Sequence, residues 1–354
     1  MKTIFQFAAR TLLLAAVSAC LALSARADIK YSLVNLSAIV PGASAIDINN
    51  AGDVLLSGND KTYLYKGGVA YQIPTDFGLT ALSGVSLNDH DQIVGMGTTV
   101  GGLRETYSYD FGTSTGAVTN LIPQNSNDQL LSLNNLGMTA VGTYTGTQYI
   151  THVFDSSGHS ILPLGLGGNG LNNAGDLWVN ESYTYNLITG QTSEAESGYS
   201  DGAVFGDNGW FAATSPSVLA RGKLGDNEVP VTTLGTVSSV LYASDINGNG
   251  VVVGSIWKFP ELYPYRAFTA DENGIVDLND VAPLFAGNYY AQARAINDAG
   301  EIIGYFGNQD VIASGDFLLI PIGSPVPEAS SAAWALGGLL IVGALAWRRR
   351  LLSS

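Results

Sequence analysis

The chain carries, at residues 295–304, the sequence Ala295-Ile296-Asn297-Asp298-Ala299-Gly300-Glu301-Ile302-Ile303-Gly304. It consists of a short apolar approach, an Asn, two residues, a Gly and a second apolar run. Asn hydrogen-bonds to its own backbone and Gly readily takes a positive φ, so the centre of this stretch predicts a tight hairpin turn. The apolar runs on either side are typical of strands, because apolar residues in a helix recur every three or four positions.

The same pattern occurs seven times along the chain, and the fifth copy is the most degenerate. The marker residues are Asn49, Asn88, Asn134, Asn172, Gly206, Asn247 and Asn297. The Gly three positions later is present in all but the second copy, as Gly52, Gly137, Gly175, Gly209, Gly250 and Gly300. The markers are 34 to 50 residues apart, about 41 on average. This period is that of the blades of a β-propeller.

A second strand-like segment follows most of the markers. These segments are Thr62–Tyr65, Glu105–Tyr109, Thr151–Phe154, Ser182–Tyr185 and Arg266–Thr269. Each leads to a turn and a short closing strand, such as Ile275–Leu278, so that one unit contains four strands. Four consecutive strands make one antiparallel blade. The chain is therefore predicted to be all-β, with seven four-stranded blades in residues 28–322.

The two ends of this region predict how the ring closes. The last unit ends at Asp316–Ile320 without a fourth strand, whereas Ile29–Val34 is a strand that belongs to no unit. We expect this N-terminal strand to complete the seventh blade. Such a pairing closes the ring on its own termini and hides the edges of its sheets.

The repeat resembles the HAF-type extracellular repeats of bacterial secreted proteins. The triplet Arg266-Ala267-Phe268 is close to the His-Ala-Phe triplet of that family, and its histidine is kept only at His152, without the Ala. The resemblance covers most of residues 28–322. It implies a propeller-like array and no particular activity.

The composition agrees with short strands joined by Gly and Asn turns. Of 354 residues, 46% are hydrophobic, 43 are glycines and 13% are charged, which excludes a disordered chain and long Lys- and Glu-rich helices. Six of the 15 basic residues lie at the two ends, so nine remain between them beside all 30 acidic residues. Such an acidic body repels phosphate, which excludes nucleic acid as a favoured partner and leaves neutral or cationic partners.

Residues 1–27 have the anatomy of a secretory signal peptide. An apolar core, Leu12–Leu23, precedes the cleavage sequence Ala25-Arg26-Ala27, and the mature chain would begin at Asp28. An alternative is a lipobox-like Val17-Ser18-Ala19-Cys20, in which Cys20 becomes a lipidated N-terminus. After cleavage at Ala27 the mature chain has no cysteine, so neither disulfides nor thiol chemistry are expected.

The C-terminal residues 323–354 are predicted to form a membrane-spanning tail. The apolar segment 330–347 is close to the ~20 residues that span a bilayer. Three arginines, Arg348, Arg349 and Arg350, follow it directly. Arginines mark the cytoplasmic side, so we expect the body of the protein on the outer side of the membrane.

The same tail resembles the PEP-CTERM sorting signal of Gram-negative bacteria. The short motif Val326-Pro327-Glu328-Ala329 precedes the apolar span and the arginine cluster, in the order of that signal. Ala329 stands where the family usually has a second proline. The resemblance implies an exosortase as partner, a membrane enzyme that would cut near Pro327-Glu328 and release the protein to the cell surface or the exopolysaccharide matrix.

No catalytic or metal-binding set stands out in the sequence, and no cofactor is expected. Three histidines are present, none with the spacing of a metal-ligand pair: His90, His152 and His159. Asp245, Asn247 and Asn249 match the start of a calcium loop. Because Ile256 stands where an EF-hand has its last Glu, a structural turn is preferred here to a Ca²⁺ site.

Three hypotheses for function remain, of which a Ca²⁺-stabilised matrix module ranks last. The leading one is a secreted, surface-sorted, non-enzymatic propeller that binds or scaffolds extracellular matrix or exopolysaccharide. The alternative is a propeller glycoside hydrolase or polysaccharide lyase, which needs two carboxylates about 5–10 Å apart in the central funnel. The candidate carboxylates are Asp47, Asp53, Asp176, Asp201 and Glu301, several of which recur at turn positions of the repeat.

Overall fold

The computed structural model describes residues 30–119, 121, 128–144, 146–147, 149–161, 168–179, 183–194, 204–215, 218–223, 232–236, 240–257, 265–281, 289–308 and 314–322. The fold lies in one compact unit, Tyr31–Pro321; of a second unit, Met1–Lys30 and Ile322–Ser354, only Lys30 and Ile322 are described. The predicted signal cleavage site, Cys20, the sorting motif, the helix 330–347 and the arginine cluster lie outside the described residues. Within the described part of the chain, no helix is long and apolar enough to cross a membrane.

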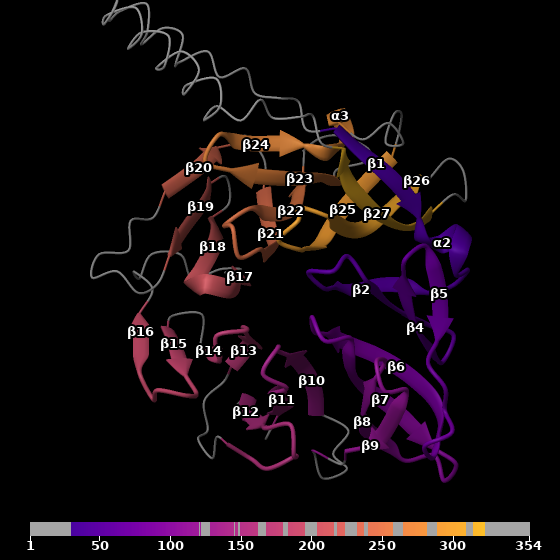
Figure 1. The fold of residues 1–354 in the computed structure, drawn as a ribbon. Coiled ribbons are helices and arrows are strands. Elements are labelled where there is room, and N and C mark those ends of the chain that lie inside the picture. The colour runs from indigo at the N-terminus through magenta and orange to yellow at the C-terminus, as the bar shows by residue number, and fades with distance from the viewer. Residues whose placement is uncertain are drawn as a thin grey trace, which may run out of the picture. The chain divides into compact units, whose positions relative to one another are not determined.

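The described strands form seven sheets around a common axis (Figure 1). Blade 1 contains β2 (Ser44–Ile48), β3 (Val54–Gly58), β4 (Lys61–Lys66) and β5 (Val69–Gln72). Blade 2 contains β6 (Leu79–Leu87), β7 (Gln92–Thr99), β8 (Arg104–Asp110) and β9 (Thr115–Val118). Blade 3 contains β10 (Asp128–Leu133), β11 (Thr139–Tyr144) and β12 (Tyr149–Phe154). Blade 4 contains β13 (Gly168–Leu171), β14 (Asp176–Val179), β15 (Tyr183–Asn186) and β16 (Thr192–Glu194).

The remaining blades complete the ring. Blade 5 contains β17 (Val204–Phe205), β18 (Trp210–Ser215), β19 (Val218–Lys223) and β20 (Thr232–Thr236), with a 3₁₀ turn at Asp207–Gly209. Blade 6 contains β21 (Val240–Ile246), β22 (Val252–Trp257), β23 (Tyr265–Asp271) and β24 (Gly274–Asp277), followed by the short helix α3 (Leu278–Val281). Blade 7 contains β25 (Tyr289–Ile296), β26 (Ile302–Asn308), β27 (Ser314–Ile322) and β1 (Lys30–Asn35).

These sheets confirm the predicted seven-bladed, four-stranded propeller. Blades 1, 2, 4, 5 and 6 each have four strands in chain order. In blade 3 an antiparallel bridge between Phe154 and Ser160 lies where the other blades have their fourth strand.

Closure of the ring also follows the prediction, since β1 is hydrogen-bonded beside β27. The Ser32 hydroxyl donates to the carbonyl oxygen of Ile320 at 3.3 Å. A single helical turn, α2 (Leu36–Ile39), then leads into blade 1, and Asn35 caps it by accepting the N–H of Ala38 at 3.0 Å. The first and last described strands of the chain therefore share one sheet.

The second strand of each blade is apolar on both faces because both faces are covered. In β3, Leu55 packs against blade 2, beside Leu82, whereas Val54 and Leu56 pack against Ile303 of blade 7. All five side chains are at most 2% exposed. The core of the protein is thus a series of apolar layers between adjacent blades, which explains why the apolar runs in the sequence do not alternate with polar residues.

The Asn-x-x-Gly stretches form the hairpins between the first and second strands, as predicted. The glycine takes a positive φ in six copies: Gly52, Gly137, Gly175, Gly209, Gly250 and Gly300, with φ from +73° to +80°. The second copy has Asp91 at this place, with φ +57°. Asp tolerates this conformation better than most residues, because its short side chain can hydrogen-bond locally.

The innermost strand carries a β-bulge in six of the seven blades. The bulges lie between Ala45 and Asp47, Gly84 and Ser86, Leu130 and Ser132, Gly168 and Gly170, Ala243 and Asp245, and Ala293 and Ala295. A bulge changes the direction in which a side chain points. Each one here ends two residues before a marker, and at three of these positions the side chain bonds to the next blade: Asp47, Ser86 and Asp245.

Candidate functional site

The inner strands of all seven blades surround a polar channel on the axis of the ring. Its cavity has a volume of about 410 Å³. The described residues that line it include no Lys, Arg or His, but they include five aspartates: Asp47, Asp89, Asp207, Asp245 and Asp298. The channel therefore has a negative electrostatic potential.

The marker asparagines form a ring of hydrogen bonds that passes from blade to blade. Each is at most 5% exposed, and its Nδ2 donates to the carbonyl oxygen of the marker in the next blade. The bonds run from Asn49 to Asn88 (3.2 Å), Asn88 to Asn134 (3.1 Å), Asn134 to Asn172 (2.9 Å), Asn172 to Gly206 (3.3 Å), Asn247 to Asn297 (2.9 Å) and Asn297 to Asn49 (3.0 Å). We call this set the asparagine ring. It bridges six of the seven junctions between blades.

Each marker asparagine also holds its own hairpin. Oδ1 of Asn134 accepts the N–H groups of Leu136 at 3.0 Å and of Met138 at 2.9 Å. The same pair of bonds occurs at Asn49, Asn88, Asn172 and Asn247. The carbonyl half of the amide fixes the turn while the amino half reaches the next blade. An aspartate could accept the same two bonds but could not donate the third.

A second ring lies beside the first and consists of the residues that follow the markers. The backbone N–H of each donates to the side chain of its counterpart in the next blade. The bonds run from Asn50 to Asp89 (2.7 Å), Asp89 to Asn135 (2.8 Å), Asn135 to Asn173 (2.6 Å), Asn173 to Asp207 (2.8 Å), Gly248 to Asp298 (2.7 Å) and Asp298 to Asn50 (2.9 Å). We call this set the outer ring. Its amides also donate to the carboxylates of Asp89 and Asp207.

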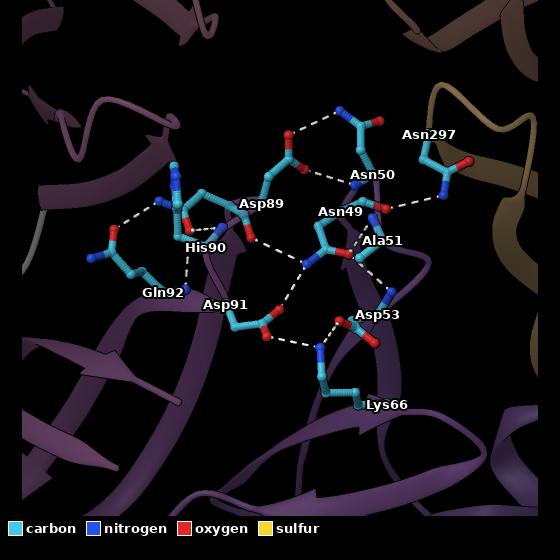
Figure 2. Close-up of polar contacts among 11 residues, drawn as sticks. Asn49, Asn50, Ala51, Asp53, Lys66, Asp89, His90, Asp91, Gln92 and Asn297 are labelled. Atoms are coloured by element: carbon cyan, nitrogen blue, oxygen red, sulfur yellow. Dashed lines mark hydrogen bonds and ion pairs between the residues drawn. The ribbon is translucent and has the colours of Figure 1, made fainter. Parts of the chain in front are cut away.

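The junction between blades 1 and 2 shows how both rings combine with charge (Figure 2). Besides its bond to the carbonyl oxygen of Asn88, Asn49 Nδ2 donates to Oδ1 of Asp91, also in blade 2, at 3.0 Å. Lys66 of blade 1 forms ion pairs with both Asp53 and Asp91, and these contacts raise the pKa of its ammonium group. His90 lies in the same turn as Asp91, and its backbone N–H donates to Asn88 Oδ1.

Both rings are interrupted at the junction between blades 5 and 6. Blade 5 has Gly206 instead of the marker asparagine, and blade 6 has Gly248 where the outer ring needs a side chain. A Cβ at Gly206 would overlap the carbonyl oxygen of Ile246 and lie 3.0 Å from its Cγ2. Asn208, two residues later, donates instead to the carbonyl oxygen of Gly248 at 3.2 Å. The missing asparagine thus reflects a closer approach of two backbones.

Two carboxylates in the channel wall connect adjacent blades at the bulges. Asp47 Oδ2 accepts the N–H of Leu87 at 2.8 Å and the hydroxyl of Ser86 at 3.0 Å. Asp245 Oδ2 accepts the N–H of Ile296 in blade 7 at 2.9 Å. Each carboxylate also accepts the N–H of the residue that follows it. Both carboxylates are therefore held by the backbone.

The environment of the channel favours the protonated form of several aspartates. The pKa of Asp245 is raised to about 7, chiefly by burial and to a smaller extent by the nearby charges of Asp47 and Asp207. Burial likewise raises the pKa of Asp47 and of Asp207. For Asp207 the charges of Asp298 and Asp89 act in the same direction. The negative charge of the channel therefore depends on pH in the neutral range.

The predicted calcium candidates use their side chains for other contacts. Asp245 accepts two backbone N–H groups, and Asn247 Oδ1 accepts those of Asn249 and Val251. Asn249 Nδ2 donates to the carbonyl oxygen of Asp298 at 2.9 Å. Among the described residues, no group of three or more His, Cys, Asp or Glu side chains could hold a metal ion.

The structure places the predicted carboxylate candidates in different surroundings. Asp47 lines the channel, whereas Asp53, Asp176 and Glu301 occupy the fourth position after a marker. Asp176 and Glu301 accept the second amino hydrogen of their own marker asparagine, at 3.1 and 2.7 Å. Asp201 lies outside the described residues. Only Asp47 is thus brought into the channel, where it joins Asp245.

Sequence reasoning identified the turn residues but missed their contacts with the next blade. A recurring Asn predicts a turn from local chemistry, whereas its partner in the next blade is a backbone carbonyl that leaves no trace in the sequence. The outer ring had a visible signal: six of the seven residues after the markers are Asn or Asp. A second polar position that recurs with the same period indicates that the turn also makes contacts outside its own hairpin.

Two solved structures of similar architecture are distant from this chain in sequence. No protein-family model matches the chain, and no curated protein is similar to it. The β-propeller domain of the Trilobed protease from Pyrococcus furiosus has a TM-score of 0.53 and 13% identity, over 79% of this chain and 93% of that one. That domain has an open velcro topology, whereas in the present chain β1 pairs with β27.

The acylaminoacyl peptidase of Pyrococcus horikoshii gives a similar match. Its TM-score is 0.53 at 9% identity, over 80% of this chain and 52% of the peptidase. The present chain thus spans about half the length of that enzyme. At such identities the likeness shows the propeller fold alone.

Proposed function

We propose that this protein is a secreted, non-enzymatic propeller that binds or scaffolds extracellular polysaccharide. The observation that carries the proposal is that the polar groups of the channel wall are engaged in bonds between blades. Asp47 and Asp245 accept backbone N–H groups, and the amides of both rings bridge neighbouring blades. Side chains used in this way keep the blades in a fixed arrangement, which suits a rigid scaffold for binding.

The acidic body of the chain narrows the class of ligand. Its negative channel repels anionic polymers, so uncharged polysaccharides are favoured over polyuronates. Many side-chain hydroxyls and amides of the propeller can bond to sugar hydroxyls without a change in protonation.

A screen of the purified full-length chain on bacterial exopolysaccharides tests this proposal. We expect retention of the protein on neutral polymers, with no release of reducing sugar and no unsaturated product absorbing at 232 nm, a wavelength typical of lyase products. The same screen with Asp47→Asn and Asp245→Asn should give unchanged results for product formation. Turnover that disappears in either variant would overturn the non-enzymatic proposal.

One observation favours the enzyme as a second candidate. Asp245 has a pKa raised to about 7, chiefly by burial, and Asp47 is close enough for its charge to contribute. A carboxylic acid that is protonated near neutral pH can act as a general acid, and a second carboxylate nearby can act as base or nucleophile. If this candidate is right, hydrolysis should follow a bell-shaped pH profile, and Asp245→Asn should remove the limb near pH 7.

We further propose that the protein is exported and then sorted through its C-terminal tail. This proposal rests on the signal-like residues 1–27 and on the resemblance of residues 326–354 to a PEP-CTERM signal. Replacement of Pro327 and Glu328 by Ala should leave the chain in the membrane fraction of the native host. Release of the variant at the normal rate would argue against an exosortase-type step.

A further inference from the structure

A second cavity lies between blades 2 and 3, away from the channel. Its volume is about 450 Å³, and it shares only Leu133 with the lining of the channel. Its walls include Ser108, Tyr109, Asp110, Ala117, Thr139 and Asp155. We call it the inter-blade cavity. Small-molecule sites in proteins typically have volumes of about 300 to 1,000 Å³, so it is large enough to hold a sugar unit.

The wall of the inter-blade cavity contains hydroxyls that the fold does not use. Thr139 is only 5% exposed, yet its hydroxyl has no hydrogen-bond partner among the described residues. The hydroxyl of Ser108, in the neighbouring blade, is likewise without a partner in the described part of the chain. Because both hydroxyls line the cavity and are not used within the fold, they are free to bond to a polar occupant.

Two carboxylates supply acceptors on opposite blades. A hydrogen bond from the backbone N–H of Thr113 lowers the pKa of Asp110, and one from the hydroxyl of Ser157 lowers the pKa of Asp155. Both groups are therefore ionised at neutral pH and accept hydrogen bonds without donating them. The turns from β8 to β9 and after β12 fix their positions.

The remaining wall combines polar groups with apolar side chains and carries no positive charge. Val94 and Leu133 are buried apolar side chains that pack together at this junction and line the cavity. No Lys, Arg or His is present among the described residues of the wall. An apolar floor with a rim of hydroxyls and carboxylates matches the apolar C–H face and the hydroxyl edge of a sugar ring. An acidic sugar would meet two negative charges and no cation.

We propose that the inter-blade cavity binds an uncharged hexose unit of a polysaccharide. The carboxylates of Asp110 and Asp155 accept sugar hydroxyls, while the hydroxyls of Thr139 and Ser108 complete the contacts. This assignment rests on the proposed function and names the place and the sugar class through which the protein engages its matrix.

Calorimetric titration of the full-length chain tests the proposal with defined probes. The probes are neutral hexamers of glucose, mannose and galactose, and a hexamer of mannuronate as the anionic comparison. We expect at least one neutral hexamer to bind and the mannuronate hexamer not to bind. Equal or tighter binding of the mannuronate hexamer would overturn the assigned sugar class.

Two variants address the site itself. Thr139→Val replaces the hydroxyl by a methyl group and keeps the shape of the side chain in β11. We therefore expect binding of the neutral hexamer to be about five-fold weaker. Ala117→Trp, on the exposed strand β9, fills the mouth of the cavity and should weaken binding more than ten-fold. Val69→Trp, on the equivalent outer strand of blade 1 and half exposed, is the control and should bind like the parent chain.

The outcomes separate this site from the proposed function. Binding by the parent chain that survives both cavity variants overturns the inter-blade site and leaves the proposed function standing. If no neutral hexamer or polymer binds to the parent chain, both proposals fail. Circular dichroism and the urea midpoint of each variant show that a loss of binding does not come from unfolding.

Discussion

The junction between blades 3 and 4 and the junction between blades 5 and 6 bring together the same kind of strands by different chemistry. At the first, Asn134 and Asn135 connect to blade 4 through both rings. At the second, Gly206 and Gly248 interrupt both rings. Adjacent blades of a propeller must be held together, so the second junction shows what can replace an asparagine.

At the junction between blades 5 and 6, which we call the irregular junction, an arginine and a tryptophan make contacts in place of the two rings. Arg221 of blade 5 is buried, and its guanidinium donates to the carbonyl oxygen of Gly250 and to Glu272 of blade 6 at 3.0 Å. The same group lies 4.9 Å from the ring centre of Trp210. An apolar cluster from Ala212 and Leu219 to residues of blade 6 adds to the contact.

This comparison shows that the asparagine ring depends on the distance between the inner strands of adjacent blades. The amide of asparagine fits where two inner strands leave room for a side chain at the marker position. At Gly206 the backbone of Ile246 occupies that room, so the junction is joined further from the axis. Close packing of backbones and bonding through side chains are alternatives at this position.

The largest expected effect is that of Asn134→Ala at the regular junction. Three backbone groups lose their partner: the buried carbonyl of Asn172 and the partly buried N–H groups of Leu136 and Met138. At 1–3 kcal/mol for each orphaned group, we expect the free energy of unfolding to fall by about 4 kcal/mol. Urea unfolding followed by tryptophan fluorescence measures the loss.

Asn134→Asp is the matched control for that prediction. It keeps the acceptor for the turn but places a buried carboxylate oxygen against the carbonyl oxygen of Asn172, so at pH 7 it should lose at least as much stability as Asn134→Ala. A much smaller loss for Asn134→Asp would mean that the bond between blades contributes little to stability.

The second prediction installs the regular residue at the irregular junction. Gly206→Asn should lower the free energy of unfolding by about 3 kcal/mol, because its side chain overlaps the backbone of Ile246. Gly206→Ala, which has the same overlap through its Cβ, should lose a similar amount. A more stable Gly206→Asn variant would show that blades 5 and 6 leave room for an amide.

The third prediction removes the substitute contact. Arg221→Met keeps the length of the side chain but leaves the carbonyl of Gly250 without its donor and removes the contact with Trp210. We expect a loss of about 2 kcal/mol in the free energy of unfolding. The loss should add to that of Asn134→Ala in a double variant, because the two sites share no partner.

The smallest expected change, counted per pH unit, concerns the junctions at which Asp245 or Ser86 bonds to the next blade. The folded pKa of Asp245 is about 7 and the unfolded value is near 3.8, so between these values the folded state binds the proton more tightly. Stability from this group is therefore complete below pH 4 and falls as the pH rises towards 7, by at most about 1.4 kcal/mol per pH unit.

The variant Asp245→Asn should flatten this slope, as urea midpoints at pH 4 to 8 would show. Ser86 makes the corresponding contact at the junction of blades 2 and 3, where its hydroxyl accepts the N–H of Leu133 at 3.2 Å. Ser86→Ala removes this bond and also the bond to Asp47 that lowers the pKa of that carboxyl, so its cost in stability should grow as the pH rises. A slope that is unchanged in Asp245→Asn would contradict the raised pKa.

The repeat predicted the propeller because each unit carries the complete chemistry of its own hairpins. Asn and Gly at fixed spacing specify the turn, and apolar runs on both sides specify strands covered on two faces. The spare strand near the N-terminus and the missing strand of the last unit were enough to predict the pairing of β1 with β27.

The channel and the inter-blade cavity could not be predicted in the same way. Asp47 and Asp245 point to the next blade because a bulge precedes them, and a bulge depends on the pairing of two strands. Ser108 and Thr139 are ordinary strand residues of different blades, and only their juxtaposition makes a cavity. Such sites arise from contacts between units, whereas a sequence repeat reports the contacts within one.

The pairing of β1 with β27 determines when the fold can be completed during synthesis of the chain. The first strand to leave the ribosome must wait until almost the whole propeller has been synthesised before its partner exists. Each earlier blade can form its hairpins as its residues emerge from the ribosome. The ring can close only when β27 is available to pair with β1. A chain shortened before Ser314 would therefore keep six blades and expose two unsealed edges, a form suited to removal by proteases and to aggregation.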